Sequence, residues 1–278
     1  MSAETKHGVA FPAAEADGSP AFGQWSQFAG LYWRELLRTF RNPWVLVMTI
    51  VQPFMWLAFF GSSFSGAPPA LVRQLFGTSS YLAFLLPGVL STSMLSIGMF
   101  GSMSTIQDKR FGFMKRILIT PTSKATVFLS KALGSATRGL VQIPVMIGAA
   151  LVFGVQFAGD PLMWGAWVLA LLFLGLGFSA LFLAVTASST DWQTPGVISN
   201  FLTMPLMFAS TALFPAGNFP GWMQSISSVN PVTYSALFGR GIVVDDVAHW
   251  IYLGYLGLFA AVLLLLGTLV ASRYLKVE

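Results

Sequence analysis

Residues 163–187 read MWGAWVLALLFLGLGFSALFLAVTA and include no charged side chain. The stretch lies between Asp160 and Asp191, in an interval that contains no Asp, Glu, Lys or Arg. A helix needs about 20 predominantly apolar residues to cross the hydrocarbon core of a bilayer. An α-helix also satisfies its own backbone hydrogen bonds, which lipid cannot do. These residues therefore predict a membrane-spanning helix.

Five other charge-free intervals predict five more spans. The expected spans lie near 44–61, 81–106, 133–157, 163–187, 196–213 and 250–271. Of the 278 residues, 55% are hydrophobic and 9% are charged, whereas soluble proteins carry about 25% charged residues. We therefore expect an all-α integral membrane protein whose six transmembrane helices form one permease domain over residues 43–275. Cysteine is absent, which excludes disulfide bonds and thiolate metal sites.

The basic residues predict the orientation of the chain. Six spans place both termini on one side of the membrane. If that side is the cytoplasm, it holds thirteen of the fifteen Lys and Arg residues, and only Arg73 and Arg240 lie outside. Basic residues in short loops favour the cytoplasmic side, so we expect a multi-pass protein of the inner (plasma) membrane with cytoplasmic termini. Residues 1–23 lack the apolar core of a signal peptide and predict a disordered cytoplasmic tail. With the positive charge gathered at the membrane, we expect no nucleic-acid partner.

Residues 24–42 predict an amphipathic helix before the first span. The side chains expected on its apolar side are Trp25, Phe28, Tyr32, Leu36 and Phe40, and those opposite are Arg34, Arg38 and Arg41. Such a helix lies flat in the headgroup region of the bilayer, with its rings toward hydrocarbon and its arginines toward phosphate. Asn42-Pro43 then begins the first span.

Residues 107–131 form a long basic loop on the cytoplasmic side. Its first part, QDKRFGFMKRILITPTS over 107–123, predicts a short helix from about Gly112 to Ile119 that stops before Pro121. The mixture of basic and apolar side chains fits a surface helix held by anionic lipid, and it equally fits a helix that docks on a cytoplasmic partner. Residue chemistry alone leaves both interpretations open.

The outer segment, residues 214–245, is too apolar for an ordinary exterior loop and too rich in Pro and Gly for a span. It includes FPAGNFPGW at 214–222 and NPVTY at 230–234. Irregular backbone enters a membrane only where protein or trapped water satisfies it. The segment therefore predicts two short re-entrant helices, near 219–229 and 231–241, that dip in from the outer face.

Three places in the chain together resemble the type-2 ABC transporter permeases, and more closely the daunorubicin-resistance type of drug-export permease. They are the amphipathic helix that ends at Arg41-Asn42-Pro43, the loop DKRFGFMKRIL at 108–118 with Pro121 and Lys131 after it, and the outer segment with Asn230-Pro231 and Arg240. The resemblance covers about residues 24–275. Many permeases of the wider family carry an acidic residue just after the loop glycine, whereas this chain has Phe113, Met114 and Lys115, as in the drug-export branch.

The resemblance implies a subunit of an ATP-binding cassette exporter, which moves a hydrophobic or amphipathic molecule, such as a drug, an antibiotic or a lipid-like compound, out of the cytoplasm. It implies a cytoplasmic ATPase partner that holds ATP and Mg, and a second permease copy in a homodimer or a heterodimer. This chain lacks the phosphate-binding G-x-x-x-x-G-K-[ST] motif, so we expect no catalytic site and no cofactor in it. The loop residues expected to couple to the ATPase are Phe111, Gly112, Phe113, Met114, Lys115, Arg116 and Ile117.

Methionine, phenylalanine and small polar side chains in the second and fifth spans suit an amphipathic substrate. The candidates for the substrate path are Ser96, Met99, Phe100, Asn200, Thr203, Met204, Met207, Ser210 and Thr211. Small polar residues in spans also serve helix packing, and that alternative stays open for each of them. We place no charged residue in the hydrocarbon and assign Arg138 to the cytoplasmic side. This predicts an external energy source and a neutral, amphipathic or lipid-like substrate, because no buried group would neutralise a charge.

Two other classes of function remain as alternatives. Within transporters, the alternative is export of a lipid-linked glycan or polysaccharide; outside them, it is a channel or a scaffold that ATP does not drive. An intramembrane enzyme would need a nucleophile, metal ligands or paired carboxylates. His249 beside Asp245 and Asp246, at the outer edge of the last span, predicts a solvated cluster, and we expect no metal site.

Overall fold

The computed structural model describes residues 23–64, 66–78, 80–112, 122–157, 160–189 and 193–274, which are helical and contain no β-strand. The all-α class is therefore confirmed for these ranges. The helices are α1 Gln24–Phe40, α2 Pro43–Ser63, α3 Pro69–Phe76, α4 Tyr81–Arg110, α6 Lys124–Leu140, α7 Gln142–Val152, α8 Pro161–Ser188, α9 Thr194–Phe208, the 3₁₀ turn η1 Ala216–Asn218, α10 Gly221–Ser227, α11 Pro231–Val243 and α12 Trp250–Tyr274.

Five helical runs in the described ranges are long and apolar enough to cross a membrane. They are α2, α4, the joined pair α6 and α7, α8, and α12. Each lies over a span expected from the sequence, so a multi-pass membrane protein is confirmed. The sixth expected span, 196–213, is not: α9 has only 15 residues and ends at Phe208. At about 1.5 Å per residue it is shorter than the hydrocarbon core of a typical bilayer.

A distant side chain ends α9. Asn230 Nδ2 donates to the carbonyl oxygens of Leu206, at 2.7 Å, and Ala209, at 3.3 Å. Terminal carbonyls of a helix have no partner within the helix, so this amide satisfies two of them and lets the chain turn at 209–213. Asn230 Oδ1 meanwhile accepts from Val232 N and caps α11. The sequence pattern contained no local stop signal for this end.

The expected start of the third span is also wrong. The helix begins at Lys124, capped by Ser123, whose hydroxyl accepts from Thr126 N. It was expected at about 133, because three basic residues lie between 124 and 138 and were assigned to the cytoplasmic loop. Two of them, Lys131 and Arg138, lie inside the helix and are buried.

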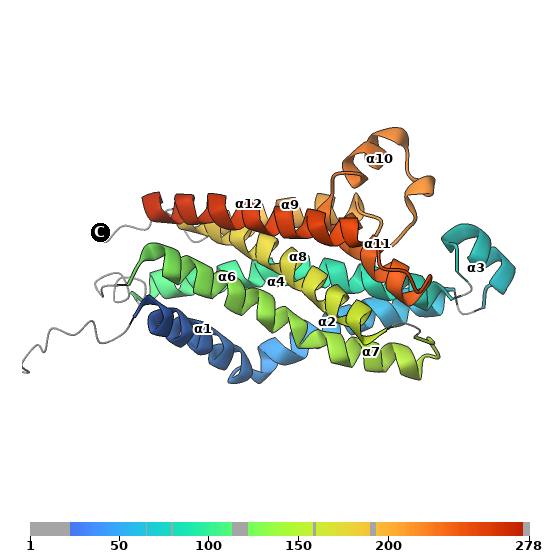
Figure 1. The fold of residues 1–278 in the computed structure, drawn as a ribbon, viewed down its shortest axis with the longest axis horizontal. Helices are drawn as coiled ribbons and strands as arrows, with labels where there is room; N and C mark the ends of the chain where they lie inside the picture. Colours follow the sequence, from blue (N-terminus) through green and yellow to red (C-terminus); the bar gives the residue numbers. More distant parts are fainter. Residues whose placement is uncertain are drawn as a thin grey trace, which may run out of the picture.

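Helix α8 lies at the centre of the bundle and packs against α4, α6 and α12 (Figure 1). Its side chains Trp167, Phe178 and Phe182 are completely buried. Helix α4 approaches α8 closely at Gly98, where an added Cβ would lie 2.9 Å from the backbone of Phe178. Small residues at such crossings allow the dense packing that associates helices in lipid.

Two short helices, α10 and α11, lie between α9 and α12, near the positions expected at 219–229 and 231–241. Helix α11 is almost fully buried against α4, α8 and α12, whereas α10 is largely exposed. Both lie near the end of the bundle that carries α3, and α1 lies near the opposite end (Figure 1). Helix α3 was not expected. That α10 and α11 re-enter the membrane stays a prediction.

Arg240 of α11 forms several contacts at the end of the bundle that carries α3, which the sequence predicts to face outward and which we call the outer end. Its Nε donates to Phe84 O at 2.9 Å, its Nη2 donates to Ala212 O at 2.8 Å, and its guanidinium lies 3.5 Å from the centre of the Phe84 ring. The 209–213 turn lies so close to α4 that a Cβ on Gly88 would be 1.9 Å from Ala212 O. Arg240 was expected on the outer side, at the end of a short helix near 231–241, and the structure buries it in protein.

Candidate functional site

The basic loop leaves α4 at Arg110 and enters α6 at Lys124. Of the residues expected to couple to an ATPase, only Phe111 and Gly112 lie within the described ranges. Phe111 follows α4 directly and is 77% exposed, and Gly112 adopts a left-handed conformation with φ of 70°. The expected helix 112–119 and the residues Phe113, Met114, Lys115, Arg116 and Ile117 lie outside them.

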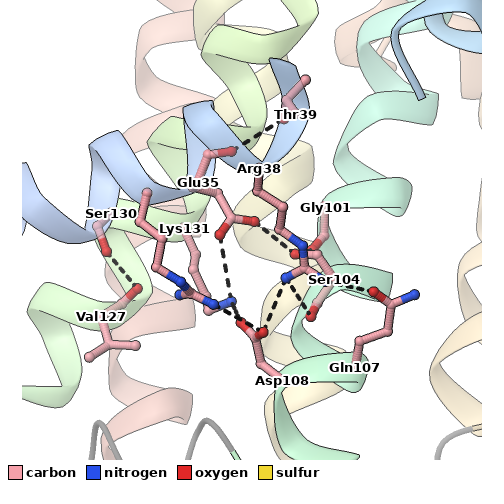
Figure 2. Close-up of polar contacts among 11 residues, drawn as sticks. Glu35, Arg38, Thr39, Gly101, Ser104, Gln107, Asp108, Val127, Ser130 and Lys131 are labelled. Atoms are coloured by element: carbon pink, nitrogen blue, oxygen red, sulfur yellow. Dashed lines mark hydrogen bonds and ion pairs between the residues drawn. The ribbon is translucent and has the colours of Figure 1, made fainter. Parts of the chain in front are cut away.

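A buried carboxylate, Asp108, lies one turn before the start of this loop and joins three helices (Figure 2). Its Oδ1 accepts from Arg34 Nη2 at 3.2 Å and from Arg38 Nη1 at 3.1 Å, and its Oδ2 accepts from Lys131 Nζ. The side chains of Asp108 and Lys131 are only 7% and 6% exposed. Buried charges are stable in a protein only when they are paired in this way.

The helical repeat explains how these side chains meet. Arg34 and Arg38 are four residues apart on α1, as are Ser104 and Asp108 on α4, so each pair lies on one face of its helix. Ser104 Oγ donates to Glu35 Oε1 at 2.9 Å, and Glu35 Oε2 lies 4.0 Å from Lys131 Nζ. We call Arg34, Glu35, Arg38, Asp108 and Lys131 the ion-pair cluster.

The ion-pair cluster gives α1 contacts that the sequence did not predict. Arg34 and Arg38 were expected to face lipid phosphate, and their contact with the membrane surface stays a prediction. Both also contact Asp108, which was expected in a cytoplasmic loop, and α1 packs against α6. Trp25 and Arg41 are exposed, so contact of these two with the membrane surface stays a prediction.

The last turn of α4 is also bonded to α8. Lys109 Nζ donates to the carbonyl oxygens of Thr186 at 2.7 Å, Ala187 at 3.2 Å and Ser189 at 3.3 Å. A cation at the carbonyl end of a helix is a favourable cap. Asp108 and Lys109, in the last turn of α4, therefore connect this helix to α1, α6 and α8. The sequence signal for these contacts was Asp108, an acidic residue that ends a charge-free interval and is followed by basic residues.

A cavity of about 210 Å³, the central cavity, lies between α2, α4 and α9. It brings together seven of the nine expected substrate-path residues, namely Ser96, Met99, Phe100, Asn200, Thr203, Met204 and Met207. The other two, Ser210 and Thr211, are buried in the turn beyond α9. Thr211 lines a separate outer cavity of about 690 Å³ beside Arg240.

A second cavity of about 410 Å³, the inner cavity, adjoins the first on the side of α1. The two share the wall residues Thr49, Gln52 and Phe100. The inner cavity has apolar walls from Trp44 and Met48, as well as buried charged groups. Among the described residues, no group of three or more His, Asp or Glu side chains is placed to hold a metal ion.

Arg138 and Glu35 line the inner cavity, although no buried charge was expected there. Arg138 was assigned to the cytoplasmic side and the spans were expected to lack charge. It lies at the midpoint of the 29-residue run from Lys124 to Val152 and is 9% exposed. The expectation that no buried group could neutralise a charged substrate was therefore wrong, because charged residues line the inner cavity.

Comparison with known proteins identifies the family. The sequence profile of the ABC-2 type transporter family matches residues 26–244. The putative transport permease ycf38 of Cyanophora paradoxa is 32% identical over 197 residues, which cover 70% of this chain and 66% of that protein. The daunorubicin resistance ABC transporter permease protein DrrB1 of Streptomyces coeruleorubidus is 24% identical over 218 residues, covering 78% and 75% of the two chains. The probable doxorubicin resistance ABC transporter permease protein DrrC of Mycobacterium tuberculosis is 28% identical over 146 residues, 52% of each.

The family match runs from α1 through α11 and includes the ion-pair cluster and the residues that line the central and inner cavities. The chain therefore belongs to the ABC-2 type transporter family of membrane permeases.

Proposed function

We propose that this chain is the permease subunit of an ATP-binding cassette exporter that moves an amphipathic or hydrophobic small molecule out of the cytoplasm. The observation that carries the proposal is the pair of adjoining cavities along α2 and α4, whose mixed apolar and polar walls suit such a molecule. The names of the two resistance permeases among the relatives favour a drug or antibiotic over a glycan.

Energy comes from a separate cytoplasmic ATPase subunit, which binds ATP and Mg. Residues 111–117 contact that subunit, with exposed Phe111 among the apolar contacts. The bonds of Asp108 and Lys109 support this role, because they tie the start of the loop to α1, α6 and α8. A displacement of the loop is then passed to several helices together. The coupling requires nucleotide states that favour different arrangements of these helices.

A second permease copy completes the translocation unit, as a homodimer or with a similar chain. The exposed apolar side chains of α2 and α9, such as Met48, Phe201 and Met204, support a protein or lipid neighbour beside the cavities. Both termini lie in the cytoplasm, as the distribution of basic residues favours.

The test is to co-purify the chain with the ATPase encoded beside it, reconstitute the complex in lipid vesicles, and measure ATP turnover with candidate compounds. Wild-type turnover should rise with an exported compound. The double variant Lys115→Glu/Arg116→Glu should lose most of that rise, because charge reversal removes attraction to an acidic rim on the ATPase.

Arg273→Glu is the matched control, since Arg273 is an exposed cation at the end of α12 and is outside the proposed contact. It should keep the wild-type response. Full stimulation of the double variant, or a chain that binds no ATPase, would contradict the proposal.

A further inference from the structure

Arg138 is a buried cation at the midpoint of one candidate membrane span. It lies at the centre of the run from Lys124 to Val152, and its Nη2 donates to the carbonyl of Ile97 on α4 at 3.4 Å. An ionisable group inside a membrane span is costly unless something pairs with it, and it therefore indicates a functional site. In the described part of the chain, no carboxylate lies within 4.0 Å of this guanidinium.

The carboxylates near Arg138 are shared with other cations, and Glu35 attracts it only from beyond 4.0 Å. Asp108 is shared by Arg34, Arg38 and Lys131, and Glu35 lies nearest to Lys131 among the cations of the ion-pair cluster. Two carboxylates thus face three cations in the ion-pair cluster, and Arg138 adds a fourth. With the partly exposed Arg34 and Arg38 included, the charge around the inner cavity is net positive, which favours an anionic ligand over a cationic one.

Arg138 is one of the residues that line the inner cavity. It lies on the cavity wall with Trp44, Met48 and Phe100. Its Nε is buried and has no hydrogen-bond partner in the described structure. A buried donor without a partner costs about 1–3 kcal/mol, so the site is incomplete as it stands. A single 3.4 Å hydrogen bond to Ile97 O offsets little of the free-energy cost of burying a full charge.

Gln142, one helical turn further along the chain, is a second buried polar side chain without a partner, and it lines the central cavity. It is completely buried, and neither its amide oxygen nor its amide nitrogen has a hydrogen-bond partner in the described structure. Since positions four residues apart lie on one face of a helix, Arg138 and Gln142 face two cavities that share Thr49, Gln52 and Phe100. We call these two adjoining cavities together the slot; Arg138 lies on the wall of one of them and Gln142 on the wall of the other.

We propose that this slot binds an anionic amphiphile, with its carboxylate, sulfonate or phosphate group on Arg138. The apolar part extends past Met48 and Phe100 into the central cavity, where Gln142 hydrogen-bonds to a polar group of the ligand. This assignment rests on the proposed function for its biological meaning, because it names the class of molecule exported. The same headgroup chemistry also belongs to a resident anionic lipid, and the experiment separates the two sources.

The test uses the full-length chain in nanodiscs of phosphatidylcholine. The probe is 11-(dansylamino)undecanoic acid, compared with its methyl ester and with the matching primary amine. Binding is followed by energy transfer from tryptophan, since Trp44 and Trp56 line the slot. Hydrogen bonds to a charged group contribute about 1.5–3 kcal/mol, so the wild type should bind the acid at least about tenfold tighter than the ester or the amine.

Arg138→Gln should abolish that preference, and Arg138→Lys should keep most of it. Arg273→Gln, a change at an exposed cation at the end of α12 that lines neither cavity, is the matched control and should bind like the wild type. Gln142→Leu should weaken binding of all three probes alike. Equal binding of acid, ester and amine by the wild type, or an unchanged preference in Arg138→Gln, would overturn the proposal.

Phosphatidylglycerol separates the two sources. If a resident lipid fills the slot, added phosphatidylglycerol should displace the acid probe from the wild type, and native mass spectrometry should find it retained by the wild type but not by Arg138→Gln. If the slot receives exported molecules, the lipid should not compete, and the acid should stimulate the ATPase complex. Probe selectivity without any ATPase coupling would leave the anion site standing and contradict the proposed function alone.

Discussion

Replacing Asp108 tests whether the ion-pair cluster holds the inner end of the bundle together. Asp108→Asn keeps the shape of the side chain but removes the charge that Arg34, Arg38 and Lys131 share. Lys131, with 6% of its side chain exposed, then becomes a buried cation without its closest partner. Removal of one member of a buried ion pair costs about 3–5 kcal/mol, and we expect a loss of this size in the free energy of unfolding.

Two further variants distinguish charge pairing from simple packing. Arg34→Gln removes a partner that is 32% exposed, and partly solvated ion pairs contribute only about 0.2–1 kcal/mol. The double variant Asp108→Asn/Lys131→Met removes both members of the buried pair, and such neutral replacements are often as stable as the pair itself. It should recover more than half of the stability lost in Asp108→Asn.

The assay is equilibrium unfolding in mixed micelles of dodecyl maltoside and dodecyl sulfate, followed by tryptophan fluorescence. All four proteins are compared at the same micelle composition. A loss in Asp108→Asn no greater than in Arg34→Gln would refute the reasoning. So would a double variant that is no more stable than the single one, because the cost would then come from shape and not from an unpaired charge.

Three other predictions concern the outer end and the topology. Gly88→Ala places a Cβ 1.9 Å from Ala212 O and should destabilise the protein by about 1–3 kcal/mol in the same assay, whereas Gly148→Ala on α7, which has open space, should be neutral or stabilising. Arg240→Met removes both hydrogen bonds to Phe84 O and Ala212 O and should cost at least about 2 kcal/mol; stability equal to the wild type would show that the arginine does not hold the outer end. Reporter tags inserted after Gly66 and after Ser123 should be accessible from opposite sides of the membrane in intact cells, and labelling of both from one side would contradict the topology.

The sequence predicted the fold where hydrophobicity alone determines structure. The spans α2, α4, α8 and α12 are charge-free over most of their length, and their positions follow from the thickness of the bilayer. Seven expected substrate-path residues also meet in one cavity, because Ser96, Met99 and Phe100 lie along one part of α4 and the others along α9. Their contact with substrate stays a prediction.

The sequence failed where polar side chains bond across helices. Rules based on hydropathy assign charged residues to water, so Lys131 and Arg138 were expected outside the membrane, although both lie inside α6. Their burial depends on Asp108 and on the carbonyl of Ile97, which come from a different helix. The end of α9 likewise depends on Asn230, more than twenty residues later. No local pattern contains these partners.

Asn230 joins the end of α9 to the start of α11, so a displacement of either helix acts on the other through one amide side chain. Helix α11 also packs along α4, where Arg240 adds two hydrogen bonds and the 209–213 turn lies close to Gly88. If an exit opens at this end of the bundle by movement of α11 away from α4, the hydrogen bond from Arg240 to Phe84 O must break, and a substitution at Arg240 would make that movement easier.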